Sequence, residues 1–114
     1  MPEGPEIRRT GDRLRKVLVG KEILESNLLY YRIRDKAELI KGKNIIEIST
    51  KGKAMLLRFD NGWAIYSHNQ LYGRWTVNLN SATIKSNRAI RIIFKTNTHT
   101  VRLWSATDIE LIET

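Results

Sequence analysis

The first residues of the chain place an amine and two carboxylates close together. Pro2 follows the initiator methionine, and removal of Met1 would leave its secondary amine as the free start of the chain. An α-amino group ordinarily has a pKa of about 7.7–8.0 against about 10.4 for lysine, so more of it is unprotonated near neutral pH. A secondary amine that attacks an aldehyde-level carbon forms an iminium ion, which is an electron sink for elimination at the adjacent carbon. Glu3 and Glu6 are three residues apart, so on a helix both carboxylates would lie beside the amine and could transfer protons.

The same residues also have ordinary structural explanations. Pro2 could be a second residue without any chemical role. Glu3 and Glu6 would each suit the amino end of a helix, where the helix dipole favours negative charge. The residues alone leave both explanations open.

A short basic turn is expected at Lys51-Gly52-Lys53, between two strand-like runs. Glycine permits a tight turn and lets a backbone or a ligand come close. The two lysines would project from the tip of this loop. There they would either remain solvated or contact a phosphate or a base, and the tripeptide alone does not decide between these alternatives.

The segment from Ser67 to Gly73 joins two further strand-like runs. It carries an amide, an apolar and an aromatic side chain in succession, at Gln70, Leu71 and Tyr72. Proteins that kink or open a duplex insert apolar wedges of this kind, and an amide can pair with an orphaned base. The structural alternative is a loop that folds Leu71 into the core.

A helix from about Pro5 to about Val19 is the first element that must position these groups. Proline suits the first helical position, and Gly20 provides an end. The apolar stripe of the helix recurs at spacings of four, three and four residues: Ile7, Gly11, Leu14 and Leu18. The other side is basic and forms either a solvated face or a patch that faces phosphates.

After Gly20 the pattern changes to short apolar or alternating runs that are typical of β-strands. We expect strands at Ile23–Tyr30, Asn44–Thr50, Lys53–Phe59, Trp63–Ser67, Arg74–Leu79, Ala89–Lys95 and Thr100–Trp104. Asp60-Asn61-Gly62 is a strong hairpin signal. A further turn is expected at residues 96–98.

The predicted fold is mainly β: an antiparallel β-sandwich flanked by an amino-terminal helix. Asp35, Glu38 and Gly42 fit one or two capped helical turns. The stretch Asn78–Asn87 is rich in Asn, Ser and Thr, and we expect it to be a flexible loop. No linker or repeat divides the chain, so one domain is expected, and its end at Thr114 is consistent with a larger protein cut at a domain boundary.

Composition limits the functions available to the 114 residues. There is no cysteine, which excludes a disulfide, a thiolate zinc site and a catalytic thiol in this chain, and only two histidines are present, so we expect no metal centre. The apolar runs are too short to span a membrane, which predicts a soluble intracellular protein. The net charge of +8 favours a polyanionic partner, nucleic acid first and an anionic membrane second.

Three motifs together resemble one family. They are Pro2–Ile7 (PEGPEI), Lys51–Ala54 (KGKA) and Tyr66–Gly73 (YSHNQLYG), and Ser105–Glu110 also looks like the end of the same domain. Their order along the chain is similar to that in the amino-terminal domain of the formamidopyrimidine-DNA glycosylase and endonuclease VIII family, and closest to its bacterial endonuclease VIII branch. The resemblance covers essentially the whole of residues 1–114.

The resemblance implies base excision repair of double-stranded DNA that contains oxidised bases or abasic sites. In the family pattern, the amine of Pro2 attacks the sugar C1′, displaces the flipped-out base and then supports β- and δ-elimination. Glu3 matches the acid/base residue that protonates the opening sugar ring, and Glu6 matches a residue that supports the site. Lys53 matches the functional lysine of the family.

The wedge that fills the gap left by the flipped nucleotide matches Gln70, Leu71 and Tyr72. This wedge resembles the branch that prefers oxidised pyrimidines, as does Gly4, where the oxidised-purine branch commonly has leucine. The resemblance therefore implies a DNA N-glycosylase and AP lyase with a preference for oxidised pyrimidines.

The chain differs from the family pattern because it lacks two of the family's domains. The helix–two-turns–helix domain and the zinc-finger domain of the family are absent, so no cofactor is expected in this chain. Much of the phosphate grip lies in those domains, so activity of this part alone is expected to be impaired and sensitive to salt. We expect a monomer in the bacterial cytoplasm, associated with the nucleoid.

Two other functions remain open. The chain could be a non-catalytic fragment that binds damaged DNA through its basic helix and wedge. It could also be a small-molecule tautomerase that uses Pro2 as a base, although this gives no reason for the Gln-Leu-Tyr wedge or for the charge of +8.

Overall fold

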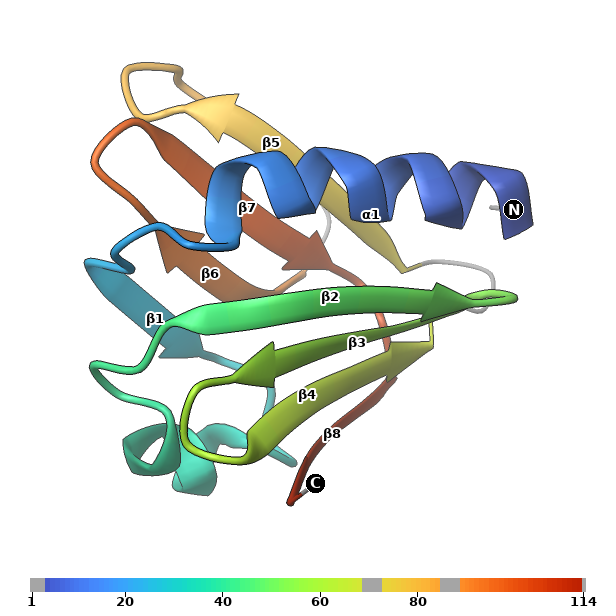
Figure 1. Ribbon diagram of the computed structural model, residues 1–114, viewed down its shortest axis with the longest axis vertical. Coiled ribbons are helices and arrows are strands. Elements are labelled where there is room, and N and C mark those ends of the chain that lie inside the picture. Colours follow the sequence, from blue (N-terminus) through green and yellow to red (C-terminus); the bar gives the residue numbers. More distant parts are fainter. Residues whose placement is uncertain (1–3, 69–72, 85–88, 114) are drawn as a thin grey trace.

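Two four-stranded antiparallel sheets form the body of the protein, and one helix packs across their edges (Figure 1). The structure is a computed structural model, and it describes residues 4–68, 73–84 and 89–113. The antiparallel sandwich with an amino-terminal helix confirms the fold class predicted from the sequence. The elements are, in chain order, α1 (Gly4–Leu18), β1 (Glu25–Leu28), the 3₁₀ helix η1 (Arg34–Leu39), β2 (Ile45–Lys51), β3 (Ala54–Phe59), β4 (Trp63–His68), β5 (Arg74–Leu79), β6 (Ile90–Lys95), β7 (His99–Trp104) and β8 (Asp108–Glu113).

Helix α1 buries the stripe that its sequence predicts. The side chains of Ile7, Leu14 and Leu18 are buried, and so is Gly11. The helix contacts β2 and β5, which are the edge strands of the two sheets. Because an edge strand presents unpaired backbone groups, a helix across both edges closes that side of the sandwich.

The first sheet has the strand order β1-β6-β7-β5, and all of its neighbouring strands are antiparallel. The turn predicted between β6 and β7 is confirmed. In it, the buried side chain of Thr96 accepts hydrogen bonds from the backbone amides of Thr98 (3.3 Å) and His99 (3.1 Å). The hydroxyl of Thr96 therefore satisfies backbone amides in the turn, where the hydrogen bonds between strands are interrupted.

The second sheet has the order β2-β3-β4-β8, built from two consecutive hairpins and a returning strand. The predicted hairpin between β3 and β4 is confirmed, with Gly62 at a φ of 89° that favours glycine. Asn61 holds this turn, because its side chain accepts a hydrogen bond from the amide of Trp63 and donates one to the carbonyl of Leu39.

Inward-facing residues of both sheets form one apolar core. Phe59 of the second sheet and Phe94 of the first are each about 1% exposed or less, and their ring centroids are 6.1 Å apart. Burial of side chains of this size contributes about 1.5–3 kcal/mol each. The core therefore supplies a rigid support for the loops at both ends of the sandwich.

Strand β8 was not among the strands predicted from the sequence. The alternation is nonetheless present: Ile109 and Leu111 are buried, whereas Glu110 is exposed. This strand pairs with β4 along its whole length, from Trp63↔Glu113 to His68↔Asp108.

Two local predictions also need correction. The helical turn around residues 35–42 exists, but η1 begins after Ile33, whose side chain makes no capping hydrogen bond, so Asp35 lies inside the first turn and is not a cap. The stretch expected to be a flexible loop, Asn78–Asn87, begins inside β5, and residues 85–87 lie outside the described part. Asn80 is held by hydrogen bonds to Thr96 and Thr100.

No helix within the described ranges is long and apolar enough to cross a membrane.

Candidate functional site

One end of the sandwich gathers the segments that the sequence singled out. Helix α1 begins there, β2 turns into β3 there, β4 ends there and β5 begins there, as the right-hand side of Figure 1 shows. The strand register is the reason: Ala54 pairs with Lys51 on one side and with His68 on the other. His68 in turn pairs with Asp108, which places the start of β8 at the same end.

A groove of about 580 Å³ lies between the first turns of α1 and the β2–β3 turn. One wall is formed by Pro5, Arg8 and Arg9 of the helix, and the other by Thr50, Lys51 and Gly52 of the turn. We call it the α1–hairpin groove. Gly52 has a φ of 58°, so the tight turn at this position favours glycine, as the sequence predicts.

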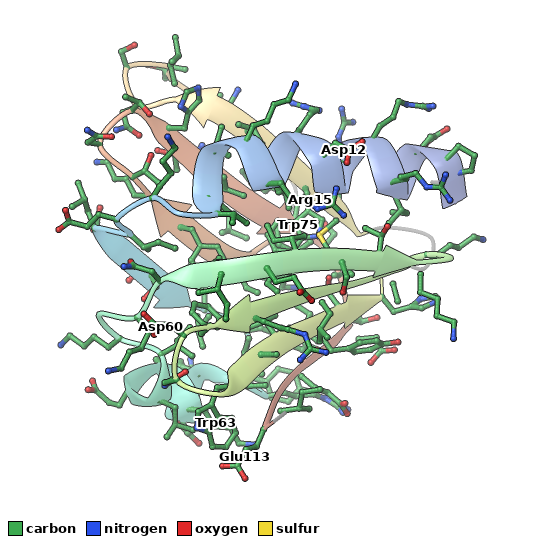
Figure 2. All side chains as sticks on the ribbon, in the orientation of Figure 1. Asp12, Arg15, Asp60, Trp63, Trp75 and Glu113 are labelled. Atoms are coloured by element: carbon green, nitrogen blue, oxygen red, sulfur yellow. The ribbon has the colours of Figure 1, made fainter. Side chains whose placement is uncertain are left out.

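Close contacts fix α1 against β2 beside this groove. A Cβ atom added to Gly11 would lie 2.8 Å from Cγ2 of Thr50, so the helix approaches the strand at a point where only glycine leaves room. One turn further along the helix, Nε of Arg15 donates a hydrogen bond of 2.7 Å to the carbonyl of Ile48 on the edge of β2. Figure 2 shows Arg15 on the side of α1 that faces β2, next to Asp12, with which it forms an ion pair.

The structure places only some of the predicted site residues. Glu6 is exposed in the first turn of α1, and Lys53 is half-buried directly after the turn, where it interacts with other groups of the protein. The groove is built on the same two segments. The remaining candidates lie outside the described residues: Pro2, Glu3, Gln70, Leu71 and Tyr72.

The charges around the α1–hairpin groove are positive. Arg8, Arg9 and Lys51 are exposed on its walls, and the part of the lining that the structure describes contains no carboxylate. The sequence predicts one basic side for the helix over residues 5–19. The structure separates Arg15, which bonds to β2 and Asp12, from the arginines at the groove. Helical spacing gives no signal for this separation, because Arg8 and Arg15 are seven residues apart and share a side of the helix.

Two tyrosines on other parts of the surface have shifted pKa values. Burial raises the pKa of Tyr66 in β4, and the carboxylates of Asp108 and Glu110 raise it further. At η1, the neighbouring Arg32 lowers the pKa of Tyr31 through a hydrogen bond to its hydroxyl. These groups do not line the α1–hairpin groove.

Two buried polar atoms flank the segment 69–72 in sequence. They are Oγ of Ser67 and Nε1 of Trp75, and neither has a hydrogen-bond partner in the described part of the chain. The sequence carried no signal for them. Across the same described ranges, no group of three or more His, Asp or Glu side chains is gathered that could hold a metal ion.

The family model of the formamidopyrimidine-DNA glycosylase N-terminal domain matches residues 1–108. The chain belongs to this family. The match includes all three motifs that suggested it, and it ends at the first residue of β8.

Curated relatives within the family carry the name Endonuclease 8. The protein from Salmonella agona is 39% identical over 112 residues, and that from Escherichia coli is 38% identical over the same length. In both comparisons the aligned region covers 98% of this chain and 43% of the relative. The chain therefore spans less than half the length of the curated relatives it matches.

Solved structures of the family share the fold. The formamidopyrimidine-DNA glycosylase of Lactococcus lactis, non-covalently bound to DNA containing an AP site, superposes with a TM-score of 0.81 at 21% identity. MutM in complex with DNA containing carbocyclic 8-oxo-G superposes with a TM-score of 0.82 at 22% identity. They cover 98% and 99% of this chain, and the chain covers 45% of each.

Proposed function

We propose that this chain supplies the catalytic amino-terminal domain of a bifunctional DNA glycosylase and AP lyase. The proposed substrate is double-stranded DNA with an oxidised base, pyrimidines favoured, or with an abasic site. The observation that carries the proposal is the family match over residues 1–108, which begins at the terminus where Pro2 would become a free amine. The relatives named Endonuclease 8, at 38–39% identity, favour the pyrimidine branch.

The first chemical step assigns the nucleophile to Pro2. After removal of Met1, its nitrogen forms a bond to the sugar C1′, and the bond from C1′ to the damaged base breaks, so that the base leaves with the bonding electrons. Glu3 donates a proton to the ring oxygen as the sugar opens, and the nitrogen then forms an iminium with C1′. No cofactor is needed, because the electron sink is the iminium itself.

The second step uses that iminium to break the strand. Loss of a proton from C2′ sends electrons toward the iminium, and the bond from C3′ to its phosphate oxygen breaks. A second elimination breaks the bond from C5′ to the other phosphate. Water then hydrolyses the nitrogen–carbon bond and restores the amine. Glu6 supports the site electrostatically in this scheme, and Lys53 engages the substrate backbone.

The segment that follows β4 supplies the wedge in this proposal. Gln70, Leu71 and Tyr72 enter the duplex, fill the space of the extruded nucleotide and contact the orphaned base. Support comes from topology, because the strands on both sides of this segment end and begin at the same end of the sandwich as α1 and the β2–β3 turn. The chain acts as a monomer in this scheme.

Borohydride trapping on duplex DNA with one abasic site tests the assignment of Pro2. The iminium is reduced to a stable amine, so the chain should form a covalent adduct, and intact mass should show that Met1 is absent. Pro2→Gly should abolish or strongly slow the trapping. Glu38→Gln, which removes an exposed carboxylate on η1, is the control and should trap like the parent.

Trapping that is unchanged in Pro2→Gly contradicts the nucleophile assignment. Salt-dependent DNA retention without any adduct, from a chain that lacks Met1, would instead support a non-catalytic DNA-binding fragment. That second candidate is favoured by one observation, namely that the chain spans 43% of its curated relatives.

A further inference from the structure

The α1–hairpin groove gathers three cations that have no partner among the described residues. Arg8 and Arg9 come from α1, and Lys51 comes from the β2–β3 turn on the opposite wall. All three side chains are exposed, and none of them takes part in an ion pair within the described ranges. Like charges from two different elements repel one another, so their approach costs free energy in the unliganded protein.

Three basic residues on the sheets, in contrast, are engaged by the fold. Arg58 and Lys95 pair with carboxylates across neighbouring strands. Arg91 lies over the ring of Tyr30, 4.8 Å from its centroid, and donates a hydrogen bond to the carbonyl of Ala106. These contacts use the charge of each side chain within the protein, whereas the groove leaves its charges for a ligand.

The side chains of the groove fit a phosphate group. Among the described residues, no carboxylate lines it, and Thr50 adds a hydroxyl that can donate a hydrogen bond. Guanidinium groups match the geometry of phosphate oxygens, and lysine binds phosphate as a point charge. Cations on both walls suit a phosphate that enters between the helix and the turn.

We propose that the α1–hairpin groove binds a backbone phosphodiester of the DNA strand, through Arg8 and Arg9 on one wall and Lys51 on the other. This contact is separate from that of Lys53, and it rests on the proposed function because it presumes a DNA substrate. It positions the strand next to the start of α1, the part of the helix that directly follows Pro2 in sequence.

Salt dependence of DNA binding tests the proposal. For duplex DNA the logarithm of the affinity falls with the logarithm of salt concentration by about 0.9 for each phosphate contact. The double variant Arg8→Gln/Lys51→Gln should therefore reduce the slope by about one to two. When the salt concentration rises fourfold, the affinity of the parent falls by an extra factor of about 3.5 for each phosphate contact, and a variant that lacks the contact is spared that factor. Fluorescence anisotropy with a labelled abasic duplex measures this slope.

The double variant Arg13→Gln/Lys16→Gln is the matched control. It makes the same change of net charge on exposed residues of the same helix, but neither residue lines the groove. It should keep the slope of the parent. An equal change of slope in both double variants, or none in Arg8→Gln/Lys51→Gln, would overturn the groove assignment.

A further arm distinguishes a strand phosphate from a free anion. Inorganic phosphate should displace the duplex no better than chloride at equal ionic strength, and displacement that is clearly stronger would overturn the assignment to the strand. Borohydride trapping separates this inference from the proposed function. An adduct together with an unchanged slope contradicts only the groove, whereas a parent chain that neither binds nor traps the duplex contradicts both.

Discussion

The contact between Gly11 and Thr50 makes the position of α1 testable by a double-mutant cycle. A Cβ atom at position 11 would lie 2.8 Å from Cγ2 of Thr50. Carbon atoms in favourable contact are about 3.5–4.0 Å apart, so the overlap is about 0.7–1.2 Å. The helix must move away from β2, or the threonine must rotate, before alanine can be accommodated.

Two opposing terms set the size of the effect of Gly11→Ala. Alanine is favoured over glycine in a helix interior by about 1 kcal/mol. Overpacking a well-packed site costs about 1–3 kcal/mol. With the middle of that range, the free energy of unfolding should fall by about 1 kcal/mol, which corresponds to a fall of about 4 °C in Tm for a domain of this size.

Thr50→Ser removes the methyl group that causes the overlap. Because this methyl group is only partly buried, the single change should cost about 0.4 kcal/mol, half of a fully buried methylene. When Thr50→Ser is already present, Gly11→Ala should raise the free energy of unfolding by about 1 kcal/mol, the propensity gain alone. The coupling between the two positions is therefore expected to be about 2 kcal/mol.

Urea denaturation of the parent, the two single variants and the double variant measures this coupling. A coupling below about 0.5 kcal/mol would refute the reasoning, because it would mean that the methyl group of Thr50 does not limit the approach of α1. The same would follow if Gly11→Ala alone were stabilising by the full propensity gain. Borohydride trapping by the same four proteins would show whether a displaced helix also slows the chemistry proposed for Pro2.

Two further outcomes follow from single side chains. Arg15→Met keeps the aliphatic stem but removes the hydrogen bond to the carbonyl of Ile48, and it should lower the free energy of unfolding by about 1.5–3 kcal/mol in urea denaturation. Absorbance titration of the tyrosinates should move toward higher pH in Tyr31→Phe and toward lower pH in Tyr66→Phe, since Arg32 lowers the pKa of Tyr31 and burial raises that of Tyr66. Because the folded-state pKa of Tyr66 is raised, its contribution to stability is present below pH 10 and is lost as the pH rises through that pKa.

Local signals in the sequence were sufficient for most of the fold. The stripe that includes Ile7 and Leu14 is buried, and the Asp-Asn-Gly turn at residues 60–62 joins β3 to β4. Strand β8 was not predicted, although its alternation places Ile109 and Leu111 inside, where they are buried. Its pairing with β4 is a contact between distant parts of the chain.

The arrangement of the candidate site depends on contacts between distant parts of the chain. Arg8 and Lys51 share a groove although 43 positions separate them, and no periodicity in either segment indicates which end of α1 meets the β2–β3 turn. The helix is held there by close packing, such as that of Gly11 against Thr50, and the sequence showed this glycine only as a member of an apolar stripe. The motifs identified the chemistry of the candidate residues, whereas long-range packing determined which of the described ones are neighbours.

Two sets of basic residues are expected to respond differently to salt. Arg58 and Lys95 form ion pairs that are about half exposed, and such pairs contribute only about 0–1 kcal/mol to folding. Screening them therefore changes the stability of the sandwich little. The cations of the α1–hairpin groove would act on a polyanion, where each contact adds a steep dependence on salt. The three cations of the groove would therefore govern binding while contributing little to folding, at the end of α1 nearest to Pro2 in sequence.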